Sequence, residues 1–327
     1  MQITDKVYGK FVISEPILVE LINSKPLQRL KGINQAGASQ YAIKRKTVTR
    51  YDHSVGVMIL LKKLGASIEE QIAGLLHDVP HTAFSHVIDF VFKEKNDKHE
   101  FHEKFHKKII LESEIPSILK KFGFDINRII DEHNFNLLER QLPDLCADRI
   151  DYTLRDMVAF EGFKKKINIY LSSFVIRDGE IMMDDRLTAK NFAEDYLRMD
   201  EENWSHPQEV ALFQILADAL KIALEKKIIN KADLFKNDKW VYSKLKESKN
   251  KSILIKLDML NPKIKIIDDP KNFDFHSRNK LRYIDPTYIN SENSATWVSH
   301  TFNDFSDKLE KHKEWIKRGN FIKIISY

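Results

Sequence analysis

Apolar residues recur every three or four positions along most of the first 230 residues, which is the spacing of one face of an α-helix. Two short runs rich in β-branched and aromatic residues interrupt this pattern. They predict one hairpin over residues 5–16, around Gly9, and another over 172–185, where Asp178 and Gly179 supply a tight turn. The apolar spacing predicts helices over residues 17–22, 55–64, 68–76, 85–92, 105–111, 115–121 and 142–160, and further helices from residue 189 to about 229. The expected fold class is therefore mainly α, with short β-hairpins.

The pattern changes after Asn230. Strand-like runs now alternate with polar and proline-containing loops, and they cover residues 253–260, 263–268, 280–285 and 320–327. We therefore expect a first domain over residues 1–230 and a small α+β C-terminal appendage over 231–327.

Composition narrows the classes of protein to which the chain can belong. A chain of 327 residues can bury a core without disulfides, and the single cysteine, Cys146, excludes an internal one. No run reaches transmembrane length and the first residues lack the apolar stretch of a signal peptide, so a cytoplasmic protein without membrane contact is expected. The net charge of +5, from 53 basic and 48 acidic residues, permits an anionic substrate. Without an arginine-rich arm it does not indicate nucleic acid, although it leaves nucleic-acid binding open.

Candidate chemistry gathers in three compact motifs, RYDHSVGV (50–57), LLHDVPHTAFSH (75–86) and ADRIDYTLRD (147–156). His77 and Asp78 are adjacent on an apolar helix, where a bare carboxylate is costly unless it meets a cation. With His53 and Asp148 they make a mixed nitrogen and oxygen set that suits a divalent first-row metal and leaves coordination positions open. The alternative is a hydrogen-bonded core pair. The further histidines in the same motifs favour the metal site.

Those further histidines are candidates for proton transfer. His81 follows His77 by four residues and is expected to stay near the metal, even if Pro80 ends the helix. His86 precedes Asp89 by three residues, so the carboxylate can orient the imidazole as an acid or base. A third group, His99, His102 and His106, lies on one face of a predicted helix, where His99 and His106 are read as a polar surface stripe.

Together these motifs resemble the HD-domain phosphohydrolases, and most closely their deoxynucleoside triphosphate triphosphohydrolase branch, over residues 5 to about 229. The segments DKVYGKFVISEP and PLQRLKGINQAG precede the three motifs in the family's order. The resemblance implies an HD-domain helical bundle and homo-oligomeric assembly. It implies a metal held by His53, His77, Asp78 and Asp148, with His81, His86 and His102 contacting phosphate or moving protons. It also implies phosphate contacts from Arg50 and Arg149, and sugar contacts from Gln35, Tyr152 and Asp156.

One motif departs from the family. Where the family has a tyrosine, one residue, then His-Lys, the chain reads Trp204-Ser205-His206-Pro207, so the phosphate-binding lysine is replaced by proline. Trp204 is a candidate for stacking on a base, and an aromatic residue at that spacing is also typical of a core.

The function predicted from the residues and the resemblance is that of a metal-dependent phosphohydrolase acting on nucleotides and releasing triphosphate from deoxynucleoside triphosphates. A phosphodiesterase or phosphomonoesterase with the same metal site is one alternative. A nucleotide-binding or nucleic-acid-binding protein with little turnover is the other. The divalent metal is expected to be Mn²⁺, Fe²⁺, Ni²⁺, Zn²⁺ or Mg²⁺, a choice that the ligand types leave open.

Overall fold

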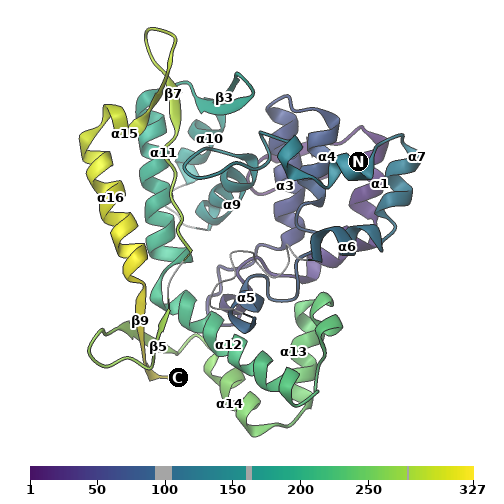
Figure 1. Cartoon of the computed structure of the whole chain (residues 1–327), viewed down its shortest axis with the longest axis vertical. Helices are drawn as coiled ribbons and strands as arrows, with labels where there is room; N and C mark the ends of the chain where they lie inside the picture. The colour runs from purple at the N-terminus through teal and green to yellow at the C-terminus, as the bar shows by residue number, and fades with distance from the viewer. Residues whose placement is uncertain (93–104, 160–163, 278–279) are drawn as a thin grey trace.

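The computed structural model describes residues 1–92, 105–159, 164–277 and 280–327. Over these residues the chain is mainly helical with three small sheets, as the sequence predicts (Figure 1). The helices up to residue 230 are α1 (Pro16–Asn23), α2 (Lys25–Arg29), α3 (Arg50–Lys63), α4 (Ile68–Leu76), α5 (Val87–Val91), α6 (His106–Leu111), α7 (Ile115–Lys121), α8 (Ile126–Ile129), α9 (Ala147–Val158), α10 (Lys164–Ser173), α11 (Arg186–Met199) and α12 (Pro207–Glu225). They are followed by α13 (Asp238–Glu247), α14 (Lys251–Met259), α15 (Val298–Thr301) and α16 (Asn303–Arg318).

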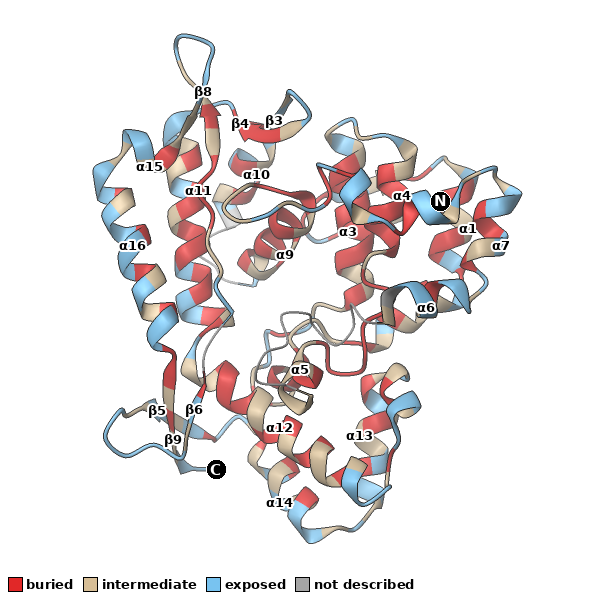
Figure 2. Cartoon of the chain, in the orientation of Figure 1, coloured by how far each residue is buried: buried red, intermediate tan, exposed pale blue. Residues whose placement is uncertain are grey.

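Helix α3 organises the part of the fold that carries the candidate site. It begins five residues before the predicted start because Thr49 caps it: the Thr49 hydroxyl accepts from the Asp52 amide, and the Asp52 carboxylate accepts from the Thr49 amide. The early start places Arg50 and His53 on the helix. Helix α3 packs against both α4 and α9, and buried residues mark all three helices in Figure 2.

The strands form three separate sheets. Strands β1 (Gln2–Asp5) and β2 (Gly9–Val12) make the first hairpin, which begins three residues earlier than predicted. Strands β3 (Phe174–Arg177) and β4 (Glu180–Met183) make the second, with its turn at Asp178 and Gly179 as predicted. Strand β4 pairs in parallel with β7 (Thr287–Ile289), which pairs with β8 (Ala295–Trp297). The third sheet has the order β5 (Lys265–Asp268), β9 (Asn320–Ser326), β6 (Phe275–Ser277).

Two predictions about elements in the last 140 residues are wrong. Residues 253–260 form most of helix α14 rather than a strand, because Asn250 caps the helix and Ile253 and Leu257 bury one helical face. Residues 280–285 form no strand. The helices predicted over residues 189 to about 229 are α11 and α12, which a π-helical turn, η6 (Asp200–Trp204), and Pro207 separate.

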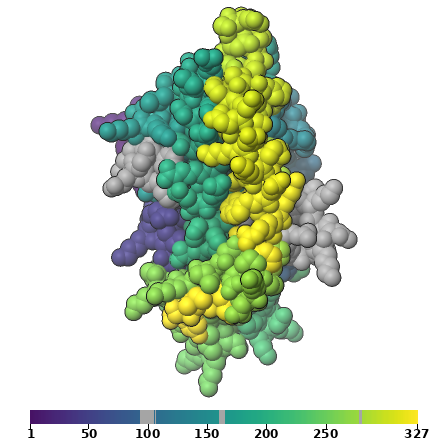
Figure 3. Space-filling model, turned by 90° about the vertical axis from the view of Figure 1, so that its left-hand side faces the viewer, coloured from purple at the N-terminus to yellow at the C-terminus, as the bar shows by residue number. Residues whose placement is uncertain are grey.

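The C-terminal third is closely packed against the first 230 residues. Helices α13 and α14 pack on α12, α16 packs on α11, and β7 extends the sheet of β4. Figure 3 shows the last residues as a band along one face of the molecule. A second hydrophobic cluster joins Leu212, Leu216 and Leu220 of α12 to residues beyond 230. The boundary at residue 230 remains a prediction. In the described part of the chain, no helix combines the length and the apolar character needed to cross a membrane.

Candidate metal centre

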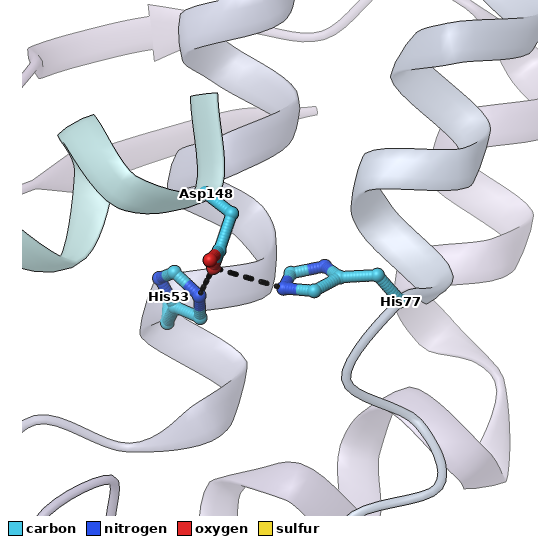
Figure 4. A group of neighbouring side chains, drawn as sticks. All are labelled: His53, His77 and Asp148. Atoms are coloured by element: carbon cyan, nitrogen blue, oxygen red, sulfur yellow. Dashed lines mark hydrogen bonds and ion pairs between the residues drawn. The ribbon is translucent and has the colours of Figure 1, made fainter. Parts of the chain in front are cut away.

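Three predicted ligands, His53, His77 and Asp148, point toward one another (Figure 4). His53 Nε2 lies 2.8 Å and His77 Nε2 3.5 Å from Asp148 Oδ1, and the donor atoms of all three residues lie within 4.8 Å of one another. They come from three elements: His53 from α3, His77 from the C-terminal cap of α4 and Asp148 from the first turn of α9. Packing of α3 on the other two helices brings them together.

The hydrogen bonds of the two imidazoles leave one nitrogen of each ring for a metal. His77 Nδ1 lies 2.7 Å from the Gly74 carbonyl oxygen, and His53 Nδ1 lies 2.8 Å from Asp151 Oδ2. Each Nδ1 therefore donates to its acceptor, which leaves Nε2 of each ring turned toward the common point as the nitrogen that would bind a metal. His77 Nε2 is buried and has no hydrogen-bond partner among the described residues, an arrangement that costs free energy unless a cation meets it. The donor set fits a divalent metal.

Asp78, the fourth predicted ligand, lies beside these three. Its Oδ1 is 3.6 Å from His77 Nε2 and its Oδ2 is 3.9 Å from His53 Nε2. It is not in the set whose donors all lie within 4.8 Å of one another. Arg50 Nη1 donates to both of its oxygens, at 3.1 and 2.9 Å, and His81 Nε2 lies 3.0 Å from Oδ1. Burial raises the pKa of Asp78, but the positive charges of Arg50, His81 and His77 together outweigh burial and hold that pKa well below its usual range.

The charges at this centre also shift the pKa values of the ligands. Burial lowers the pKa of His77, but the carboxylates of Asp78 and Asp148 outweigh burial and raise that pKa to about 10. The pKa of His53 is likewise raised: burial opposes the shift, and hydrogen bonds to Asp148 and Asp151 drive it. Metal binding at these two rings therefore competes with protons.

A buried network that the sequence analysis missed supports His53. Asp151 Oδ2, which accepts from His53, also accepts from Arg155 Nε at 2.6 Å, while Asp151 Oδ1 accepts from the Tyr8 hydroxyl at 2.7 Å. Arg155 Nη2 continues to Asp5 Oδ2 at 2.8 Å, which ties the first hairpin to the centre. The sequence could have identified Asp151, because it follows Asp148 by three residues on α9 and shares its helical face.

Gly56 makes room for this network. A Cβ at Gly56 would lie 1.6 Å from Arg155 Nη2 and 2.2 Å from Asp151 Oδ1, which is far closer than a Cβ approaches a non-bonded atom. The first motif therefore needs glycine at position 56, so that Asp151 and Arg155 can pack behind His53.

The candidate acid–base residues lie next to the ligands. The His81 and His86 rings are 5.1 Å apart in an edge-to-face arrangement, and His81 reaches Asp78 as described above. His86 Nδ1 lies 3.1 Å from Asp89 Oδ2, so the pair expected from their spacing is formed. His102, the remaining candidate, lies outside the described residues.

The predicted phosphate-binding arginines both have protein partners. Arg50, in addition to Asp78, donates from Nε to the Ser85 hydroxyl at 3.0 Å. Arg149 donates to the carbonyl oxygens of Asp144 and Arg140. Their guanidinium groups therefore already fix the loops around the centre.

The predicted sugar-contacting and base-contacting residues form an aromatic cluster near His53. The ring centroids of Tyr152 and His53 are 6.5 Å apart, and those of Tyr152 and Trp204 are 5.1 Å apart. The Tyr152 hydroxyl lies 2.5 Å from that of Tyr196. Asp156 Oδ2 accepts from Trp204 Nε1 at 2.6 Å and from Asn203 Nδ2 at 3.1 Å.

Gln35, the remaining predicted sugar contact, differs from these residues. Its Oε1 is buried and has no hydrogen-bond partner in the described part of the chain. It follows Asn34, whose carbonyl oxygen accepts from Ser85 at 2.7 Å, so it lies close to the loop that carries His81 and His86.

Comparisons with known proteins identify the family of the chain. Residues 50–156, which contain all four predicted ligands, match the HD domain model. The uncharacterized protein YdhJ of Bacillus subtilis is 41% identical over 331 residues, covering 99% of this chain and 99% of YdhJ. The metal-dependent phosphohydrolase cns2 of Cordyceps militaris is 36% identical over 219 residues, covering 65% of this chain and 63% of cns2.

A more distant relative and a solved structure are also similar to the chain. The deoxynucleoside triphosphate triphosphohydrolase SAMHD1 of Mus musculus is 26% identical over 159 residues, covering 42% of this chain and 23% of SAMHD1. The crystal structure of a hypothetical protein from Aquifex aeolicus has the same fold, with a TM-score of 0.70 at 19% identity, covering 97% of this chain and 100% of that one. The chain belongs to the HD-domain family of metal-dependent phosphohydrolases.

Proposed function

We propose that this phosphohydrolase acts on nucleotides and releases triphosphate from deoxynucleoside triphosphates. The observation that carries the proposal is the convergence of His53, His77 and Asp148 beside the His81–His86 pair. A metal site with adjacent histidines combines the two elements that phosphoryl hydrolysis needs, charge stabilisation and proton transfer.

In this proposal His53, His77, Asp78 and Asp148 hold the metal, which supplies Lewis-acid polarisation of a phosphoryl oxygen and lowers the pKa of water. His86, oriented by Asp89, moves a proton at Nε2, because its Nδ1 is occupied by the carboxylate. His81 is held by Asp78 and lies edge-on to His86, where it contacts a phosphate oxygen. Arg50 keeps Asp78 ionised beside the ligands.

The aromatic cluster and Gln35 support a nucleotide as the substrate. The Tyr152 ring lies 6.5 Å from that of His53, and the Trp204 ring lies 5.1 Å from that of Tyr152. Aromatic rings of this kind bind sugars and bases by stacking. The buried Gln35 Oε1 needs a donor, which a sugar hydroxyl supplies. The similarity to SAMHD1 agrees with a deoxynucleotide.

Two observations favour the alternative, a phosphodiesterase or phosphomonoesterase. Pro207 stands where the family pattern has a phosphate-binding lysine, which weakens the case for a bound triphosphate. Asp156 already accepts two hydrogen bonds, from Asn203 and Trp204, which reduces its capacity to accept from a sugar hydroxyl.

A turnover panel tests the proposal. Purified protein loaded with Mn²⁺, Fe²⁺, Ni²⁺, Zn²⁺ or Mg²⁺ is incubated with deoxynucleoside triphosphates, ribonucleoside triphosphates, monophosphates and cyclic nucleotides, and the phosphorus products are separated. Inorganic triphosphate supports the proposal, whereas orthophosphate or a linear nucleotide supports the alternative. Absence of turnover with every metal and nucleotide contradicts both and favours a binding protein.

Variants test the ligand assignment. His77→Ala and Asp148→Ala should lose bound metal and at least 100-fold in turnover, because each removes a donor from the cluster. His133→Ala is the matched control, since His133 is an exposed histidine whose ring lies 3.1 Å from Asp131 at the surface. Full metal content in either ligand variant would contradict the assignment.

A further inference from the structure

The loop that carries His81 and His86 has a backbone that needs outside support. We call residues 79–86 the histidine loop. Phe84 and Ser85 have φ angles of +62° and +51°, so two consecutive residues with side chains lie in the left-handed region. This conformation turns the chain between the two histidines, whose rings meet edge to face. Contacts with other parts of the chain must hold it.

Residues 234–238, which we call the clamp segment, make these contacts from beyond residue 230. The Phe84 amide donates to Asp238 Oδ1 at 2.7 Å, and the Ala83 amide donates to the Leu234 carbonyl oxygen at 2.8 Å. Two successive amides of the histidine loop are therefore bound to the clamp segment. One of them belongs to a left-handed residue, whose side chain is fully buried.

Asp238 also joins the histidine loop to residues 34–40. Its Oδ2 accepts from the Asn34 amide at 2.9 Å and from Gln40 Nε2 at 2.8 Å, and its side chain is buried. Asn34 in turn accepts from Ser85 through its carbonyl oxygen at 2.7 Å. One carboxylate thus fixes both sides of the left-handed turn.

Arg29 makes a second set of bonds between the same two segments. Its Nη2 donates to the carbonyl oxygens of Val79 and His81, at 2.6 and 2.9 Å. Its Nη1 donates to those of Phe235 and Lys236, at 3.2 and 3.3 Å. All four acceptors are backbone atoms, so Arg29 ties the start of the histidine loop to the clamp segment whatever side chains those positions carry.

Two glycines allow the segments to approach so closely. A Cβ at Gly32 would lie 2.8 Å from Asn237 Cβ, next to Asp238. A Cβ at Gly37 would lie 2.5 Å from the Phe84 carbonyl oxygen. Both positions require a residue without a side chain for the clamp to form.

We propose that Asp238 and Arg29 are positioning residues that hold the histidine loop in the conformation required for turnover. The C-terminal region then contributes to catalysis without touching substrate. This inference rests on the roles proposed above for His81 and His86. Their geometry depends on Phe84 and Ser85, which have no intrinsic preference for the left-handed region.

The test compares Asp238→Ala, Asp238→Asn and Arg29→Lys with the wild-type enzyme, all fully loaded with the metal that supports turnover. Asp238→Ala should lower kcat by about 10- to 100-fold, because a displaced acid–base group loses orientation and proton transfer. Metal content should stay at the wild-type level, KM should change less than kcat, and the pH dependence of kcat should change shape. Asp238→Asn should recover part of the loss, because its amide oxygen still accepts from Phe84.

Asp285→Ala is the matched control. Asp285 is another buried carboxylate of the C-terminal region, and it accepts a backbone hydrogen bond from Ser299 at 3.0 Å. Among the described residues it accepts none from the histidine loop. A purely structural role for Asp238 would give both alanine variants the same result: a lower melting temperature, with unchanged kcat per folded molecule and an unchanged pH profile.

Hydrogen–deuterium exchange separates this inference from the proposed function. Amides of residues 79–86 should exchange at least tenfold faster in Asp238→Ala and Arg29→Lys than in the wild type and in Asp285→Ala. Unchanged exchange, or unchanged kcat, overturns the inference. Failure of the proposed function is seen in the wild-type protein itself, which would then turn over no nucleotide with any metal.

Discussion

Asp151→Asn is the most informative single change at the metal centre, because it removes one charge and keeps the shape of the side chain. The Asp151 side chain is fully buried and serves His53, Arg155 and Tyr8. With an amide at this position, the oxygen can still accept from His53 and Arg155 while the NH2 group donates to the Tyr8 hydroxyl, so the main loss is the negative charge. The His53 ring keeps an acceptor at Nδ1 but loses the negative charge that makes its Nε2 a stronger metal ligand.

Two magnitudes follow from this geometry. Loss of a second-layer carboxylate behind a histidine ligand typically lowers metal affinity by about 10- to 100-fold. Breaking a buried ion pair typically costs about 3–5 kcal/mol of unfolding free energy. Arg155 keeps its 2.8 Å bond to Asp5, so we expect the lower end of that range here.

Metal affinity is measured by competition with a chromophoric chelator, and stability by urea unfolding of the metal-free protein. Asp195→Asn is the matched control, since Asp195 is a buried carboxylate that accepts from Lys166 and Tyr170 and has no bond to a candidate ligand among the described residues. The control should lose stability and keep metal affinity. Wild-type metal affinity in Asp151→Asn would refute the reasoning, whatever happens to its stability.

Three further predictions test other parts of the fold. Gly56→Ala should abolish folding or cost at least about 3 kcal/mol in urea unfolding, because its Cβ overlaps Arg155 and backbone shifts of that size are expensive. Removing the metal with a chelator should abolish turnover and leave the far-ultraviolet circular dichroism unchanged, because a core of this size does not depend on an ion. Burial lowers the pKa of His312, but hydrogen bonds to Asp200 and Glu201 outweigh burial and raise that pKa to about 9. Because this value exceeds the unfolded pKa of about 6.5, the protonated ring stabilises the fold fully below pH 6.5. The stabilisation is lost as pH rises through 9. His312→Gln should therefore cost about 2–3 kcal/mol of unfolding free energy at pH 6 and much less at pH 10, and an equal cost at both would contradict the assignment.

The spacing of apolar residues predicts correct limits for helices that bury an apolar face along their whole length. Helices α4 and α7 occupy the predicted residues 68–76 and 115–121. Apolar spacing alone predicts too late a start for α3, because its first turn, Arg50 to His53, is mostly polar. The apolar residues at 253–260 fit both a strand and a helix, so periodicity alone does not distinguish the two, and packing against α12 selects the helix.

The motifs identified the candidate ligands but only part of their surroundings. His53, His77 and Asp148 converge because three helices carry the motifs to one point. Asp238 could not be connected to this region from the sequence, because it lies 154 residues from Phe84 and belongs to no motif. Contacts of this range are fixed by tertiary packing, which local periodicity does not encode.

Expressing residues 1–230 alone tests whether the C-terminal third is an independent appendage, as the change in residue pattern after Asn230 predicts. In the structure, removing residues 231–327 uncovers the side of α12 that packs against Val241, Leu245, Ile253 and Leu257, and removes Asp238. Each buried side chain of this kind contributes about 1.5–3 kcal/mol, so the loss of a whole apolar face is comparable to the 5–15 kcal/mol that stabilises a typical domain. We expect the fragment to aggregate or to unfold without a cooperative transition, as followed by circular dichroism and calorimetry. A soluble fragment with a cooperative transition and full metal binding would instead establish residues 1–230 as a domain, and the clamp segment as an addition to a fold that is already complete.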